Sequence, residues 1–156
     1  MIGLLVLVLA GFWGARLFLA SSGLDYQGTD YQGVDHQVVV DDCLLDQSVC
    51  EAELSNGTRL TLEITPRPVP LMQTLQFKLN SAERRDMRPL QIDITGLNME
   101  MGLNRATFNV QDEGVWFAET LLPICSQRRM HWQAAVLIEN AQQYERVSFQ
   151  FYTVRP

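Results

Sequence analysis

Sulfur-bearing and imidazole side chains gather in two short segments of this 156-residue chain. One segment is GLNMEMG at residues 96–102, and the other is LLPICSQRRMHW at residues 121–132. Thiol and thioether sulfurs are the ligands that Cu(I) prefers. The sequence therefore predicts a Cu(I) site in which four sulfur atoms are the ligands and one histidine is a substitute. The candidate ligands are Met99, Met101, Cys125, Met130 and His131.

The same side chains also fit a sulfur-rich edge of a hydrophobic core, because methionine fills irregular gaps between other apolar groups. A third interpretation is an exposed edge that binds a partner. Two interruptions of the strand pattern favour the metal site. In the run that leads up to Gly96 the apolar positions Leu90, Ile92 and Ile94 are even-numbered, whereas Leu97, Met99 and Met101 just after it are odd-numbered. Pro123 interrupts the pattern of a later strand, where a bulge can exchange its two faces. Both interruptions lie beside sulfur side chains.

A hairpin would bring the second group of ligands together. If residues 126–129 form its loop, Cys125 and Met130 face each other across the strands, with Cβ atoms about 4.5–5.5 Å apart. His131 then points to the opposite face of the sheet, which makes it a poorer ligand. In the first segment, an extended backbone would place Met99 and Met101 on one face, about 6.7 Å apart.

Alternation of apolar and polar side chains runs through most of the chain after residue 37, and no segment after residue 21 has a convincing helical period. Turn-forming residues such as Asn56 and Gly57 separate the runs. We expect about seven to nine strands in an all-β fold, an immunoglobulin-like or cupredoxin-like antiparallel β-sandwich. The expected inward positions are Leu60, Leu62, Ile64; Leu75, Phe77, Leu79; Leu90, Ile92, Ile94; Ala106, Phe108, Val110; Trp116, Ala118, Leu122, Ile124; Trp132, Ala134, Val136, Ile138; and Val147, Phe149, Phe151.

The chain begins with an apolar run that can cross a membrane. Residues 2–20 carry one charged side chain, Arg16, and about 20 apolar residues span a bilayer as a helix. Residues 17–58 carry eight acidic side chains and no lysine or arginine, which is typical of the translocated side. A cleaved signal peptide is the alternative. The expected organisation is a transmembrane anchor at residues 1–21, an extended stalk at 22–36 and an extracytoplasmic domain at 37–156. This organisation predicts a single-pass protein of the bacterial inner membrane with its domain in the periplasm.

Cys43 and Cys50 flank the segment LLDQSV, a spacing that fits the two arms of a tight hairpin. Outside the cytoplasm we expect this pair to form a disulfide. A metal site at the pair is the alternative, but no histidine or second cysteine pair accompanies it. Cys125 is then the unpaired thiol.

Composition and motifs argue against several classes of function. The formal net charge is −6, and residues 59–156 are nearly neutral, with eleven basic and ten acidic side chains. No basic stripe is present, so we expect no nucleic-acid partner. Phosphate-binding loops, dinucleotide fingerprints, zinc-protease motifs and nucleophile elbows are also missing from the sequence. We therefore expect no enzymatic turnover.

The N-terminal apolar run, the acidic stalk, NMEMG at residues 98–102 and the LPIC…RMHW pattern together resemble the FixH-like and YtkA-like families. These are small membrane-anchored periplasmic proteins. The resemblance covers the overall plan and residues 58–138, and its most specific element is M-x-M followed by glycine. It implies copper handling in cytochrome oxidase assembly, with Met99 and Met101 as ligands and a haem-copper oxidase or its assembly factors as the partner.

The expected function is a membrane-anchored periplasmic protein that carries or delivers Cu(I). The competing expectation is a single-span accessory subunit whose sandwich docks on a larger membrane complex, without metal. Thiol redox chemistry at Cys125 is a third interpretation, although no resolving cysteine lies close to it in the sequence.

Overall fold

The period-two runs form strands in the computed structural model, which describes residues 33–82, 87–141 and 143–155. The expected anchor at residues 1–21 and most of the expected stalk lie outside these ranges. No helix within them is long and apolar enough to cross a membrane. The strands in these ranges are β1 (His36–Leu44), β2 (Cys50–Glu53), β3 (Arg59–Thr65), β4 (Thr74–Ser81), β5 (Met87–Gly96), β6 (Asn104–Thr107), β7 (Asn109–Asp112), β8 (Val115–Leu121), β9 (Arg129–Asn140) and β10 (Gln143–Val154).

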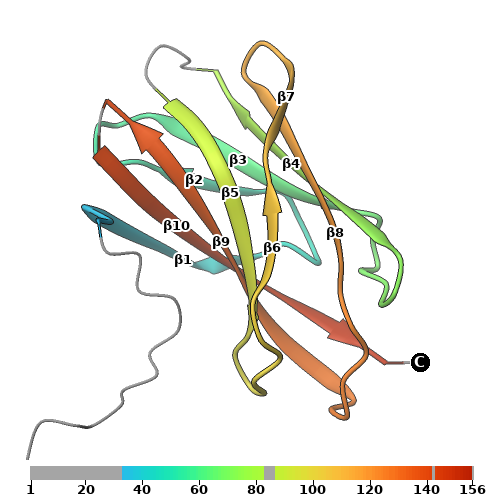
Figure 1. Ribbon diagram of the computed structural model, residues 1–156. Coiled ribbons are helices and arrows are strands. Elements are labelled where there is room, and N and C mark those ends of the chain that lie inside the picture. Colours follow the sequence, from blue (N-terminus) through green and yellow to red (C-terminus); the bar gives the residue numbers. More distant parts are fainter. Residues whose placement is uncertain (1–32, 83–86, 142, 156) are drawn as a thin grey trace, which may run out of the picture. The chain divides into compact units, whose positions relative to one another are not determined.

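The strands form two stacked sheets of five strands each (Figure 1). The first sheet has the order β1-β10-β9-β5-β6, and the second has the order β2-β3-β4-β8-β7. Neighbouring strands are antiparallel except β1 and β10, which run parallel. The inner faces of the two sheets pack on each other and form one hydrophobic core. The predicted all-β sandwich is therefore confirmed.

The strand count exceeds the expected seven to nine because one expected strand is divided between the sheets. The run from Ala106 to Val110 forms β6 in the first sheet and β7 in the second. Phe108 lies at the crossing and is 7 % exposed, whereas Val110 is 72 % exposed and not part of the core as expected. A strand at the rim of a sandwich can change sheets in this way, since it needs a partner on one side only.

The expected inward positions of β3, β4, β9 and β10 are all buried. Leu90 in β5 is an exception, because it is only partly buried. The register of β5 against β9 slips between Pro89 and Gln91, which leaves Leu90 as the extra residue of a bulge. Proline has no N–H to donate to the ladder, and this explains why the slip occurs here.

Cys43 and Cys50 form a disulfide, which confirms the predicted pairing. They are not the arms of a hairpin, however. Cys43 lies in β1 of the first sheet, and Cys50 begins β2 of the second. The chain crosses between the sheets from Leu45 onward, and this leucine is fully buried. The disulfide therefore joins the two sheets at this edge.

Opening this crosslink with Cys43→Ser and Cys50→Ser together is expected to lower the free energy of unfolding by up to about 3 kcal/mol. The unfolded chain then regains the freedom that the closed loop removes. Urea unfolding of the wild type and the double variant measures the difference. A thiol count on the denatured, unreduced wild type should find Cys125 alone. Equal unfolding free energies would contradict the prediction.

A buried carboxylate connects the two sheets at one end of the sandwich. Glu145 of β10 is fully buried and accepts hydrogen bonds from the N–H (2.9 Å) and hydroxyl (2.8 Å) of Ser55. It also accepts one from Nδ2 of Asn140 (2.7 Å). Burial raises the pKa of Glu145, but the hydrogen bonds from Ser55 and Asn140, with the charge of His36, outweigh burial and lower this pKa overall. Because Ser55 lies between β2 and β3, the carboxylate links the first sheet to the second.

Candidate metal centre

Two loops meet at the other end of the sandwich. Residues 97–103 connect β5 to β6, and residues 122–128 connect β8 to β9, at the lower edge of Figure 1. Since β5 and β9 are antiparallel neighbours, Gly96 at the end of β5 lies opposite Trp132 near the start of β9. The two sulfur-bearing segments of the sequence are therefore brought to the same end of the fold.

The side chain of Asn98 holds the first loop against β9. The N–H of Leu97 donates to the carbonyl of His131 at 2.8 Å. The Asn98 amide then donates to the carbonyl of Arg129 (3.1 Å) and accepts from the N–H of His131 (3.0 Å). An amide side chain thus continues the ladder where the backbone turns away. The sequence did not single out Asn98, because its partners are 31 and 33 residues away.

Gly96 allows the first loop to fold back closely. A Cβ atom at this position would collide with the carbonyl oxygen of Met99 and would lie 3.0 Å from the methyl carbon of Met130. The parity break at Gly96 is the end of β5, and the residues after it form a loop. The expectation of an extended segment that carries Met99 and Met101 on one face is therefore wrong.

Gly96→Ala is expected to lower the free energy of unfolding by about 1–3 kcal/mol, because the added methyl group overpacks against backbone that cannot move aside easily. Urea unfolding measures this change. The methyl resonance of Met99 should shift in the variant, while that of Met87, at the far end of β5, should not. An unchanged stability together with an unchanged Met99 resonance would contradict the close approach.

Three of the sulfur side chains share this end of the fold. Cys125 is 7 % exposed, Met130 is 2 % exposed, and Met99 is partly buried against the core. The hydroxyl of Ser126 donates to the Met99 sulfur at 3.6 Å, so this sulfur lies beside the residue that follows Cys125. The Cys125 thiol donates to the carbonyl of Gln127 at 3.4 Å. Met99 and Cys125 thus come from the two loops, and Met130 is the second residue of β9.

Cys125 and Met130 do not face each other across a hairpin. β8 pairs with β4 and β7 in the second sheet, whereas β9 pairs with β10 and β5 in the first. Residues 122–128 therefore cross between the sheets. The sequence left open whether Pro123 exchanges the two faces; in the structure Ile124 is 58 % exposed and Cys125 is buried, and β8 has already ended at Leu121. Ile124 is not in the core as expected, since the chain leaves its sheet at the proline.

Met101 lies in a hollow beside these residues. It is partly buried against the core and lines a cavity of about 360 Å³ together with Ile94, Leu121 and Trp132. The amide of Asn104, which follows this loop, donates to the carbonyl of Leu121 at 2.5 Å. The start of β6 is thus attached to the end of β8, while the Met99 part of the loop is attached to β9.

His131 points to the opposite face of the first sheet, as predicted. Its Nε2 is 2.8 Å from Oε1 of Gln150, and its ring stacks on Tyr152 with centroids 4.4 Å apart. The guanidinium of Arg129 lies 4.0 Å from the centre of the same tyrosine ring. Successive residues of a strand face opposite sides, so the inward position of Met130 directs His131 outward. The structure does not bring His131 to the sulfur side chains.

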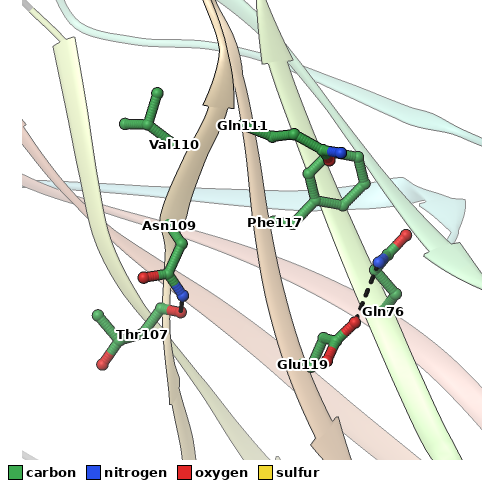
Figure 2. Close-up of a pocket in the computed structure, with 7 residues that line it drawn as sticks. All are labelled: Gln76, Thr107, Asn109, Val110, Gln111, Phe117 and Glu119. Carbon is green, nitrogen blue, oxygen red and sulfur yellow. Dashed lines mark hydrogen bonds between the residues drawn. The ribbon is translucent and has the colours of Figure 1, made fainter.

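A different hollow, of about 560 Å³, lies at the β7 edge of the second sheet (Figure 2). The amide of Gln76 donates to Glu119 at 3.1 Å there. Figure 2 draws this hydrogen bond among the side chains that line the hollow. This lining has no sulfur or imidazole group, so it offers a soft metal ion no ligand. Its residues are Gln76, Thr107, Asn109, Val110, Gln111, Phe117 and Glu119.

Within the described ranges, no group of three or more histidine, cysteine, aspartate or glutamate side chains could hold a metal ion. The candidate set at this end of the fold consists of Cys125 and methionine sulfur. Such a set suits Cu(I) better than harder ions such as Mg²⁺ or Ca²⁺. Comparison of the chain with family models, with curated proteins and with solved structures finds no match.

Proposed function

We propose that this chain is a membrane-anchored, extracytoplasmic protein that carries Cu(I) on Met99, Cys125 and Met130, with Met101 as a fourth ligand. The meeting of the two sulfur-bearing segments at one end of the sandwich supports the proposal most directly. Met99 contacts the residue next to Cys125, and the Met130 methyl group lies against Gly96 at the base of the Met99 loop. Soft donors from separate segments suit Cu(I), which prefers thiolate and thioether ligands.

Each ligand would have a distinct part in binding. Cys125 would lose its proton on binding the ion and supply the single negative charge of the site. The methionines add neutral, polarisable sulfur that favours Cu(I) over harder ions. The near-complete burial of Cys125 and Met130 limits the access of water to the ion. The expected activity is carrying and delivery, without turnover.

The proposal places the domain in the periplasm of a bacterial inner membrane, with residues 1–21 as the anchor. A haem-copper oxidase or one of its assembly factors would receive the ion. The acidic stretch at residues 17–58 supports the location. The resemblance of residues 98–102 to FixH-like and YtkA-like sequences supports the recipient. We assign the sandwich to the immunoglobulin-like or cupredoxin-like kind, in which loops gather at the two ends.

Competition between the reduced, detergent-solubilised 156-residue protein and a chromogenic Cu(I) chelator tests this function. We expect a stoichiometry of about one Cu(I) per chain, and much weaker binding of Zn²⁺ because the site lacks nitrogen ligands. X-ray absorption of the bound copper should show sulfur neighbours only. A protein that takes no Cu(I) from the chelator, or that binds Zn²⁺ equally well, would disprove the proposal.

Docking as an accessory subunit on a larger membrane complex, without metal, is the second candidate function. Exposed apolar side chains around the same end favour it, since such groups are typical of interaction sites. Met99→Leu combined with Met130→Leu separates the two functions: assembly of the membrane complex in cells should survive if only docking matters and fail if copper is needed. The exposed side chains are Met72, Leu97, Leu103, Leu121 and Ile124, which are 43–58 % exposed.

A further inference from the structure

A groove lies along the last residues of β10, beside the candidate metal centre. Its volume is about 540 Å³, and the loop between β3 and β4 forms its other side. Ile124 and Val154 in its lining are 58 % and 59 % exposed. Apolar surface of this kind at a rim is unusual for a region that contacts only water. The lining residues that matter below are Val69, Leu71, Ile124, Arg129, Val154 and Arg155.

β10 has an open edge along this groove. Its pairing with β1 ends at Gln150, so residues 151–154 pair with β9 alone. The N–H of Arg155 points to the β9 side and donates to the carbonyl of Arg128, the residue just before β9, at 2.8 Å. The N–H of Tyr152 points the other way, to a side-chain carboxylate at 2.9 Å. Backbone groups alternate along a strand, so the N–H of Val154 also points away from β9, and within the described ranges it has no hydrogen-bond partner.

The charge in the groove is positive, although the chain as a whole carries −6. Arg129 lies over a tyrosine ring, and Arg155 donates to the carbonyl of Cys125 at 3.5 Å. Among the described residues neither arginine is in an ion pair. The acidic residue in the lining, Asp46, is engaged with the backbone of Tyr152. The groove is therefore complementary to a negatively charged occupant.

We propose that this groove binds an extended segment of a partner polypeptide by strand addition to β10, and that the segment alternates apolar and acidic side chains. Its backbone would accept the N–H of Val154. One set of its side chains would lie against Val69, Leu71 and Ile124, and the other set would meet Arg129 and Arg155. Period-two alternation of the occupant follows from the extended backbone. This binding does not depend on metal.

Fluorescence anisotropy tests the proposal, with a labelled hexapeptide of alternating glutamate and valine as the probe and the detergent-solubilised 156-residue protein as the receptor. We expect saturable binding that Val154→Pro weakens about tenfold, the loss expected for one backbone hydrogen bond. Val154→Ala keeps the N–H and should weaken binding less. Arg129→Glu combined with Arg155→Glu should abolish binding. Arg59→Glu on β3, the matched charge reversal outside the groove, should leave it unchanged. A lysine–valine peptide should not bind.

Several results would overturn the proposal. One such result is that the glutamate–valine peptide fails to bind. Another is that it binds Val154→Pro and the double arginine variant as tightly as it binds the wild type. If the protein forms a dimer and Val154→Pro dissociates it, the occupant of the groove is a second copy of the chain instead. Binding to vesicles with anionic lipids, without binding to the peptide, would instead assign the surface to a membrane. Unchanged peptide affinity in Cys125→Ser is expected, and it separates this site from the copper proposal.

Discussion

Cys125→Ser is expected to lower the affinity of the protein for Cu(I) by more than about 100-fold, since residues that only position a ligand already contribute roughly 10–100-fold. The thiolate is the single charged ligand of the proposed set, and serine oxygen is a poor ligand for a soft ion. Met99→Leu and Met130→Leu should each lower the affinity less, because the Cys125 thiolate and two other methionine sulfur atoms remain. His131→Ala should change the affinity least, because this ring lies on the opposite face of the sheet and contacts Tyr152.

Chelator competition at a fixed pH measures these affinities, and urea unfolding on the same samples separates ligand loss from misfolding. Met87→Leu is the matched control. Met87 is a buried methionine in the same strand as Gly96, roughly 30 Å away along β5. Methionine-to-leucine changes conserve volume and typically cost less than about 1.5 kcal/mol of stability. Equal affinities in the wild type and all these variants would mean that the sulfur atoms only pack the core, and docking would become the better function.

Glu145→Ala is expected to lower the free energy of unfolding by about 3–5 kcal/mol. The change leaves a cavity and removes the acceptor for two groups of Ser55 and for the amide of Asn140. Glu145→Gln conserves the volume and should have a smaller effect, because an amide still accepts hydrogen bonds. Glu119→Ala is the control, since Glu119 is an exposed carboxylate on β8. Chemical unfolding at about pH 7 measures all of these changes.

The same carboxylate predicts how stability depends on pH. The pKa of Glu145 in the folded protein lies below the ordinary value of 4.5. The unfolded state therefore binds a proton before the folded state does, so this contribution is complete above that value and disappears as the pH falls through the folded pKa. The difference in unfolding free energy between the wild type and Glu145→Gln should shrink between about pH 6 and about pH 3. A difference that grows on acidification would contradict the lowered pKa.

Local patterns predicted the strands correctly where alternation alone decides which side chains face the core. In β3, β4, β9 and β10, alternation follows from the geometry of an extended chain with one face in the core, so short stretches of sequence suffice to identify it. The errors fall where the pairing of a strand is interrupted or ends. Leu90, Val110 and Ile124 lie at a bulge, beyond a crossing between sheets and after a proline, respectively. At these places burial depends on strands that are distant in sequence.

In the candidate site, too, some features follow from local sequence and others depend on contacts between distant segments. Residue type alone indicated which side chains could bind a soft ion, and alternation alone directed His131 away from Met130. The position of Met99 depended on the close approach at Gly96 and on the Asn98 amide, whose partners lie 31 and 33 residues away in the sequence.

Local sequence was enough to predict the all-β class, most inward-facing positions and the Cys43–Cys50 pairing, and to name the candidate soft ligands. Each of these depends on side-chain chemistry or on neighbours within a few residues. Only the tertiary structure decided that the disulfide and residues 122–128 join two different sheets, and that the two sulfur-bearing segments meet at one end. Strand order is a property of pairing between distant segments. Many pairings satisfy the same alternation, and the packing of the complete core selects one of them.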